Sequence, residues 1–329
     1  MIGSGDGAAV EVTDLVKRYP KAPVDSVAGI TFGVRPGEVF GFLGPNGAGK
    51  TTTIGILTTR IRLTRGRARV AGVDVMSDPV GARRLLGVVP QQNNLDRSLS
   101  VRQNLLFHAS YHGVPRAVRK ARADELLSQF GLADRPDGRP DDFSGGQIQR
   151  MMIARALMHA PTVLFLDEPS TGLDPAARLF MWERVAQLKS EGTTVVITTH
   201  DMEEATVLSD RVAIIDHGKL LALDAPAALV RDMAGERTLD CTVDPGQAVD
   251  AGAVHRELVK LAAVDRVEDL EDPGVAGWRF RVYVQGETAP LVAVVAQAIA
   301  DAGGRLTDVR LGEPTLEDVF IHLTGRSLR

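Results

Sequence analysis

A glycine-rich segment at residues 44–51 has the spacing of a phosphate-binding loop, and it lies between a predicted strand and a predicted helix. In such a loop, backbone N–H groups cradle the phosphates of a nucleotide. The lysine, here Lys50, reaches the β- and γ-phosphates, and the following hydroxyl, here Thr51, ligates Mg²⁺. The segment therefore predicts a site for a nucleoside triphosphate.

Two adjacent carboxylates, Asp167 and Glu168, end an apolar run that is typical of a buried strand. A buried carboxylate pair is costly unless a metal ion or a reacting water molecule uses it. We expect Asp167 to join the Mg²⁺ shell and Glu168 to polarise the attacking water as a general base. The alternative is that the pair caps the turn that follows.

His200 ends the next apolar run. A single histidine is more often structural than catalytic, but at the end of a strand in a phosphate site it suits a γ-phosphate contact that orients water. The other histidines share no ligand spacing, and we interpret them as surface or core residues without a zinc site. They are His108, His112, His159, His217, His255 and His322.

Ser144 and Gln147 have the spacing of a capping box at the start of a helix. A cap alone does not require Gly145 and Gly146, because each glycine in a first turn costs roughly 1 kcal/mol relative to alanine. Two glycines leave bare N–H groups at the positive end of a helix, where an anion can approach. We therefore interpret the segment as an anion contact, with the plain cap as the alternative.

The elements that must position these residues follow an α/β pattern. Apolar runs alternate with amphipathic stretches over residues 10–234, which predicts a mainly parallel sheet. Runs at residues 38–43, 162–166 and 193–199 lead into the glycine-rich loop, the carboxylate pair and His200. Open α/β sheets bind ligands at the carboxyl ends of their strands. Residues 93–160 change to helical character and predict a helical insertion.

A second domain is predicted over residues 235–329. Its expected order, βαββαβ, suggests a small α+β, ferredoxin-like sandwich followed by a last helix. The expected strands are residues 237–243, 264–270, 278–284 and 305–311, and the expected helices are 251–261, 289–302 and 314–323. Residues 1–9 are expected to form a disordered tail and no signal peptide.

Composition excludes several classes of function. The 329 residues carry a net charge of −4, which gives no support to nucleic-acid binding. The single cysteine, Cys241, cannot form an internal disulfide and fits a reducing compartment. No apolar run approaches the ~20 residues that span a bilayer, so a role at a membrane would require a partner.

Residues 10–230 resemble the nucleotide-binding subunit of an ABC transporter, because they contain six of its motifs in the expected order. Residues 44–51 resemble the family's Walker A motif, 143–147 its signature, 163–168 Walker B and 170–174 the D-loop, while Gln91 and His200 match the Q-loop glutamine and the switch histidine. The resemblance implies that Glu168 and His200 are catalytic, and that Thr51, Gln91 and Asp167 contact Mg²⁺. It assigns the ATP contacts to Tyr19, Gly44, Pro45, Asn46, Gly47, Ala48, Gly49, Lys50, Thr51, Thr52, Gln91, Ser144, Gly145, Gly146, Gln147 and Asp174.

The same resemblance implies an ATPase that works as a head-to-tail dimer. In this family, the signature of one subunit closes over the ATP held by the Walker A motif of the other. It also implies separate transmembrane permease subunits as partners and a peripheral location at the cytoplasmic face of the membrane. Residues 91–100 are the expected docking surface. Tyr19 is placed as an adenine-stacking residue, although it could instead pack on the sheet edge.

Residues 313–326 are similar to the ending of ATPase subunits from daunorubicin-resistance-type (ABC-2) drug exporters, although exporters of glycans, lipids and peptides share it. Without the family, Glu317 and Asp318 would be a solvated pair at a helix start. The signature departs from the usual pattern in Phe143 and in residues 147–150. Two other classes are weighed and disfavoured. An ABC ATPase of translation or repair usually carries two nucleotide domains per chain or long coiled-coil insertions, and neither is found in this sequence. A P-loop kinase or GTPase does not account for the signature, Glu168 and His200.

Overall fold

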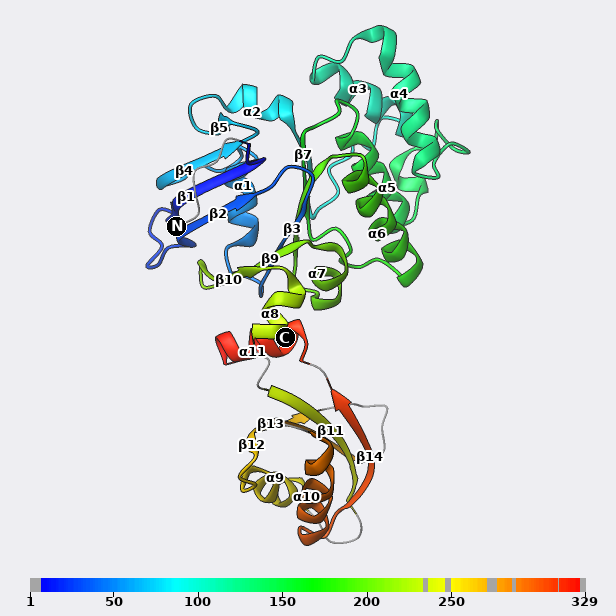
Figure 1. Ribbon diagram of the computed structural model, residues 1–329. Coiled ribbons are helices and arrows are strands. Elements are labelled where there is room, and N and C mark those ends of the chain that lie inside the picture. Colours follow the sequence, from blue (N-terminus) through cyan, green and yellow to red (C-terminus); the bar gives the residue numbers. More distant parts are fainter. Residues whose placement is uncertain are drawn as a thin grey trace. The chain divides into compact units, whose positions relative to one another are not determined.

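The computed structural model describes residues 7–232, 236–245, 250–270, 277–285, 288–312 and 314–325 (Figure 1). The chain divides into two compact units, residues 1–226 with 328–329 and residues 227–327. The division follows Pro226, ahead of the predicted domain limit at residue 234. Of the predicted tail, residues 1–6 lie outside the described residues, while Ala9 is buried and donates to the carbonyl of Val34.

A six-stranded sheet forms the centre of the first unit, in the order β10-β9-β3-β8-β7-β6. All neighbouring strands are parallel except the pair β9 and β10. Three of them, β3, β7 and β8, are buried along their whole length, as strands covered on both faces must be. The bounds are β3 Val39–Leu43, β6 Leu86–Val89, β7 Val163–Asp167, β8 Thr194–Thr199, β9 Arg211–Asp216 and β10 Lys219–Asp224.

A second, antiparallel sheet of the first unit has the order β2-β1-β4-β5. Its apolar face shares a core with the central sheet, where the rings of Phe32, Phe40 and Phe42 pack with centroids 5.1–5.5 Å apart. This core supports the strand that enters the phosphate-binding loop. The bounds are β1 Val10–Lys17, β2 Val27–Val34, β4 Arg65–Val70 and β5 Val73–Asp74.

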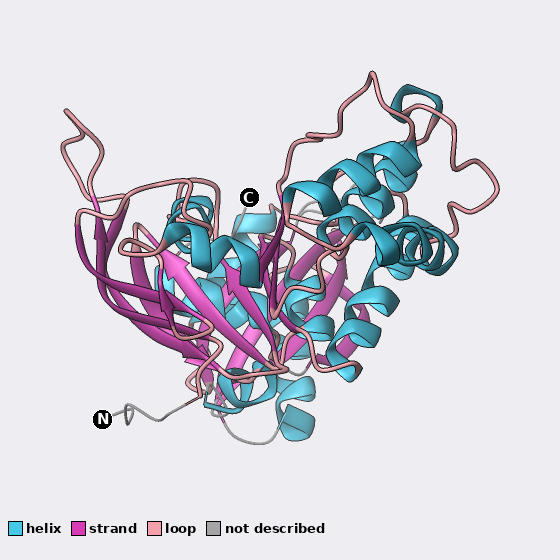
Figure 2. Ribbon diagram, turned by 90° about the horizontal axis from the view of Figure 1, so that it is seen from above, coloured by secondary structure: helices cyan, strands magenta, loops and turns pink. Residues whose placement is uncertain are grey.

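The helices of the first unit flank these strands (Figures 1 and 2). Three of them, α3, α4 and α5, lie within residues 93–160 and share one apolar core with β7, β8 and α6. Ser100 starts α3 with a complete capping box. The bounds are α1 Lys50–Leu57, α2 Pro79–Leu85, α3 Val101–Tyr111, α4 Arg116–Gln129, the 3-10 helix η1 Pro140–Asp142, α5 Gly145–Ala156, α6 Pro175–Ser190 and α7 Met202–Leu208.

The second unit contains an antiparallel sheet in the order β12-β13-β11-β14, with α9 and α10 packed on its apolar core. The predicted element order, βαββαβ with a last helix, is confirmed. The bounds are α8 Pro226–Asp232, β11 Glu236–Asp244, α9 Ala251–Val259, β12 Val264–Leu270, β13 Trp278–Gln285, α10 Thr288–Asp301, β14 Arg305–Gly312 and α11 Leu316–Thr324.

The expectation that Glu317 and Asp318 form a solvated pair is wrong for Asp318. Glu317 is exposed as predicted, but Asp318 is only 1% exposed and is not part of a solvated pair. Its carboxylate accepts hydrogen bonds from the Tyr283 hydroxyl at 2.5 Å and from the Thr315 hydroxyl and N–H at 2.7 Å. The carboxylate therefore fastens the start of α11 to β13. Among the described residues, none of the helices is long and apolar enough to serve as a membrane span.

Candidate nucleotide site

The loop between β3 and α1 presents bare backbone at three glycines. A Cβ on Gly44 would lie 2.1 Å from the carbonyl oxygen of Ile215, so only glycine fits there. Gly47 has a φ of +83°, and Gly49, at the start of α1, has a φ of +108°. These are left-handed conformations that favour glycine. The resulting cradle of N–H groups at a helix start fits the phosphates of a nucleotide.

Lys50 lies inside this loop and is 4% exposed. Its ammonium donates to the carbonyls of Gly44 at 2.5 Å and Pro45 at 3.2 Å, and it lies 3.7 Å from Glu168 Oε1. Burial lowers the pKa of Lys50, while the charges of Glu168 and Asp167 act in the opposite direction. The ammonium is thus a buried cation at the place where phosphates would arrive.

Asp167 ends β7 beside two hydroxyl groups. The Thr198 hydroxyl on β8 donates to Asp167 Oδ1 at 2.5 Å, and the Thr51 hydroxyl on α1 lies 3.4 Å from the same oxygen. Asp167 is 5% exposed, whereas Thr51 is exposed. A carboxylate and a hydroxyl are the oxygen donors that Mg²⁺ prefers, so this group fits the metal.

Glu168 has a constrained backbone. Its φ is +48°, a left-handed value that is uncommon for a residue with a Cβ. The Glu168 N–H donates to the Thr198 hydroxyl at 3.0 Å and the Thr198 carbonyl at 3.1 Å. Thr198 therefore holds both carboxylate residues. The sequence reasoning missed it, and the available signal was the pair of threonines, Thr198 and Thr199, directly before His200.

The Glu168 side chain is the point at which three predicted residues meet. Gln91 Nε2 donates to Glu168 Oε2 at 2.8 Å, and His200 Nδ1 lies 3.5 Å from Glu168 Oε1, on the same oxygen that Lys50 faces. Glu168 is 9% exposed, whereas Gln91 and His200 are exposed. Two exposed polar groups thus contact one shielded carboxylate, which is a suitable arrangement for a base and its sensors.

The signature segment has the predicted capping box. Gln147 N–H donates to Ser144 Oγ at 3.3 Å, and Ser144 N–H donates to Gln147 Oε1 at 3.0 Å. The two glycines differ, however. A Cβ on Gly146 would lie 2.8 Å from the Cβ of Ala177 on α6, so packing within the chain requires a glycine there. A Cβ on Gly145 would meet nothing within 4 Å among the described atoms.

Three further predicted contacts lie at the edges of the site. The Tyr19 hydroxyl lies 3.4 Å from the Thr52 hydroxyl, and the Lys17 ammonium covers the Tyr19 ring at 4.9 Å. The Tyr19 ring remains 38% exposed, so it can also contact a base. Asp174 caps α6 by accepting the N–H of Ala177 at 2.8 Å, which gives this residue a structural role.

The site therefore has two parts. Contacts join Lys50, Thr51, Asp167, Glu168, Gln91 and His200 into one group. The hydrogen bonds of Ser144 and Gln147 instead stay within their own helix start.

One sequence-based expectation about histidines is wrong. One ring nitrogen from each of His108, His112 and His159 lies within 4.8 Å of the other two, so three of the histidines do have a spacing that could hold a metal ion. The available signal was the spacing of His108 and His112, which places them one turn apart at the end of α3. His159 could not be added from the sequence, because it follows α5 and meets the pair only in the folded chain.

A phosphate-binding loop after a buried parallel strand, with Asp167 and Glu168 at the end of another strand of the same sheet, defines a P-loop nucleoside triphosphatase. The family model described as ABC transporter matches residues 27–171. The daunorubicin resistance ATP-binding protein DrrA2 of Streptomyces coeruleorubidus is 41% identical, covering 97% of this chain and 96% of the relative. The Nod factor export ATP-binding protein I of Paraburkholderia xenovorans is 39% identical, covering 98% and 99%.

A solved structure agrees with these sequence relatives. The dimeric, post-hydrolysis ATP-binding cassette MJ0796 bound to ADP and Pi aligns with a TM-score of 0.61 and 25% identity, covering 66% of this chain and 98% of that one. The chain belongs to the ATP-binding proteins of ABC transporters, and its activity is ATP hydrolysis. It resembles the daunorubicin- and doxorubicin-resistance members over nearly its whole length.

Proposed function

We propose that this ATPase is the energy-supplying subunit of a membrane exporter whose cargo is a drug-like or related amphiphile. Relatives named for resistance to daunorubicin, doxorubicin and linearmycin support this class of cargo. A glycan or lipid derivative is the second candidate, because two relatives at 39% identity are named for Nod factor export. A role in translation or repair finds no support among these names.

In the proposed reaction, Glu168 accepts a proton from the water that attacks the γ-phosphate of ATP. Its contacts with Gln91, His200 and Lys50 support this role, because they place one shielded carboxylate among groups that reach toward phosphate. Thr51, Asp167 and Gln91 would hold Mg²⁺, which neutralises charge on the phosphate oxygens when it is bound. Tyr19, Thr52 and residues 44–50 would bind the base and the phosphates, and the exposed His200 would orient the water.

The active unit is a head-to-tail dimer in which Ser144, Gly145, Gly146 and Gln147 of one subunit contact the ATP of the other, with Asp174 near the same junction. The single observation that carries this proposal is the open space at Gly145. Glycine there weakens the first turn of α5 by roughly 1 kcal/mol relative to alanine. Neither local packing nor a left-handed φ accounts for it, whereas a nucleotide held by a second subunit would.

A separate transmembrane permease is the proposed partner, which would bring the chain to the cytoplasmic face of the membrane. Phe107 and Tyr111 on α3 are 68% and 75% exposed, and they lie one turn apart on the same helix face. These two rings extend the expected docking surface at residues 91–100, most of which are exposed. An apolar segment of the permease that packs on this face would cover both aromatic rings.

The domain limits complete the proposal. Residues 10–234 would form the nucleotide-binding domain, with a helical subdomain over 93–160, and 235–329 the accessory domain. The order and pairing of its strands, β12-β13-β11-β14, support a ferredoxin-like sandwich. Since the predicted catalytic residues lie outside it, its proposed role is in assembly or regulation.

The test uses Glu168→Gln. The variant should bind ATP, hydrolyse it at least about 100-fold more slowly, and accumulate as an ATP-bound dimer. Size-exclusion chromatography with ATP checks the dimer, and Glu203→Gln, on an exposed carboxylate of α7, is the matched control. Normal turnover in Glu168→Gln would remove Glu168 from the base role. A chain that stays monomeric with ATP would reject the shared site, and recovery with ribosomes instead of membranes would reject transport.

A further inference from the structure

Three histidines gather at the end of α3, away from the residues assigned to ATP. His108 and His112 come from the last turn and the end of α3, and His159 comes from the turn after α5. Their candidate ligand nitrogens all lie within 4.8 Å of one another. The rings also stack, with the His112 and His159 centroids 3.9 Å apart. Such a group is either packed imidazole or a set of metal ligands.

Two nitrogens of the cluster have no assigned partner. Within the described part of the chain, His108 Nε2 and His159 Nδ1 are buried and accept or donate no hydrogen bond. Leaving a polar atom buried and unpaired costs roughly 1–3 kcal/mol, and an unseen ion or water is the usual explanation. The unpaired atoms lie on rings from two distant segments, His108 on α3 and His159 in the turn after α5, and a metal ion could bridge them.

The third observation is the tautomer of His159. Its Nε2 lies 3.0 Å from the carbonyl oxygen of Leu86, an atom that can only accept. Nε2 therefore carries the proton, which leaves the lone pair of the buried Nδ1 available to a ligand. A metal-binding histidine almost always donates its other N–H to such a carbonyl, which fixes the ring and the tautomer.

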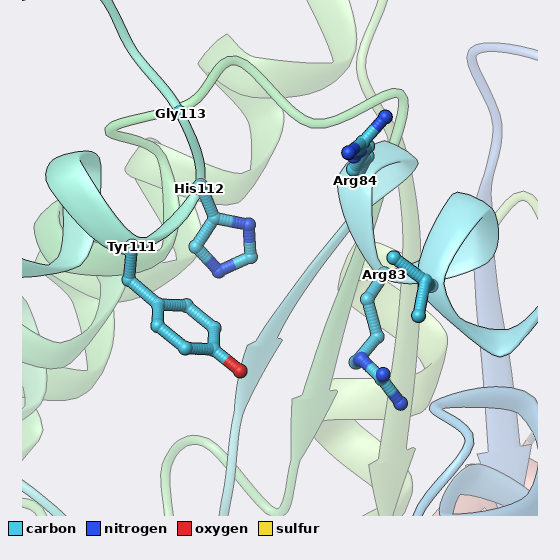
Figure 3. A pocket seen from close by; sticks show the side chains of 6 residues that line it. Arg83, Arg84, Tyr111, His112 and Gly113 are labelled. Carbon is cyan, nitrogen blue, oxygen red and sulfur yellow. The ribbon is translucent and has the colours of Figure 1, made fainter.

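We propose that His108, His112 and His159 form a binding site for a divalent transition metal of the zinc class. Three imidazole nitrogens with a fourth position open to solvent are a known donor set for Zn²⁺. Ligand nitrogens around such an ion lie about 3.4 Å apart, so the cluster closes by about an ångström through ring rotation. The His112 ring also lines an open pocket of about 620 Å³, which provides the entry path (Figure 3).

The charges around the site decide its fourth ligand. Arg83 and Arg84 line the pocket opposite Tyr111 and His112 (Figure 3). These guanidinium groups oppose a bare cation and favour an anionic fourth ligand such as hydroxide or chloride.

The test is metal binding by the full chain without an affinity tag, in excess Mg²⁺ and ADP so that the nucleotide site is saturated. Zn²⁺ should bind with one equivalent per chain in calorimetry and raise Tm. Co²⁺ should give the intense visible absorption of a four-coordinate nitrogen site. His112→Gln and His159→Gln should each weaken binding at least about tenfold, and His255→Gln, which removes a histidine of the second unit, should not.

The results of these binding experiments either support or overturn the proposed metal site. Absence of stoichiometric Zn²⁺ binding to the wild-type chain would overturn it, as would the weak absorption of a six-coordinate oxygen site. Equal affinity in His112→Gln and in the wild type would also overturn it. Because His112 is less enclosed than His159, this variant serves if His159→Gln fails to fold. A loss of Zn²⁺ affinity in His112→Gln with an unchanged Tm in metal-free buffer would support the metal site directly.

Discussion

Gln91 donates a 2.8 Å hydrogen bond to Glu168, across 77 residues of sequence. The exposed amide therefore holds the shielded carboxylate that is proposed to act as the base. A hydrogen bond to a charged group contributes roughly 1.5–3 kcal/mol, which corresponds to a factor of about 10–100. We expect Gln91→Ala to lower kcat by that factor and to lower Tm by a few degrees, because the same hydrogen bond forms without ATP. Steady-state ATPase assays with Gln92→Ala, the adjacent exposed amide, as the control check this, and equal turnover in both variants would contradict it.

Gly145 and Gly146 should respond oppositely to alanine. Gly145→Ala adds a methyl group in open space and improves helix propensity, so the fold should gain up to about 1 kcal/mol while ATP-dependent dimerisation and turnover fall. Gly146→Ala forces a methyl group against Ala177 and should lower Tm. Melting curves and ATPase assays on both variants separate the two roles. A Gly145→Ala enzyme with normal turnover would exclude this glycine from the shared site.

The histidine cluster predicts a loss of stability in mild acid. Burial, followed by the charges of His112, Arg155 and His159, lowers the pKa of His108 to about 3, whereas an exposed histidine titrates near 6.5. The unfolded chain then binds more protons below pH 6.5, so the stability that is present above 6.5 is lost as the pH falls. His108→Gln should lose about 1 kcal/mol less than the wild type between pH 7.5 and 5.5, in metal-free buffer.

The control for this comparison is His255→Gln, because it removes a histidine from the second unit and leaves the cluster intact. Urea unfolding at the two pH values gives the free energies directly. If His108→Gln and the wild type lost equal stability, the cluster would not titrate on unfolding as described.

The carboxylate of Asp318 should stabilise the second unit. Burial raises its pKa, but hydrogen bonds from Tyr283 and Thr315 and the charge of Arg281 outweigh burial and hold the pKa below its ordinary value. Asp318→Asn removes the charge that these donors face and should cost about 2–3 kcal/mol. Limited proteolysis within residues 227–327 should become faster, while Glu317→Gln, on the exposed neighbour, should have no effect. Equal proteolysis rates would show that the contact contributes little.

Much of this fold could be predicted because its strands are continuous apolar runs that end in polar residues. Asp167, Glu168 and His200 each follow such a run, so their meeting at one sheet edge follows from parallel pairing. Glycine spacing likewise identified the phosphate-binding loop. Each of these signals lies within a short stretch of sequence, so it can be identified without knowledge of tertiary contacts.

The remainder depends on contacts between distant segments. Thr198 resembles any other strand residue until its hydroxyl is seen between Asp167 and the Glu168 N–H. Asp318 has an exposed neighbour of the same charge, and its burial is explained by Tyr283 and Arg281 on β13 together with Thr315. His159 is 47 positions from His112, and no periodicity connects them. In each case the partner lies on another element, which residue spacing cannot reveal.

The left-handed backbone at Glu168 has a consequence for how this position responds to selection. A φ of +48° costs a residue with a Cβ roughly 1 kcal/mol, and glycine would avoid that cost. Glycine would also remove the carboxylate on which the proposed hydrolysis depends. The contacts of this carboxylate with Gln91 and the buried Lys50 outweigh that cost, so variant libraries sorted for heat resistance and for ATP turnover should both retain glutamate at position 168.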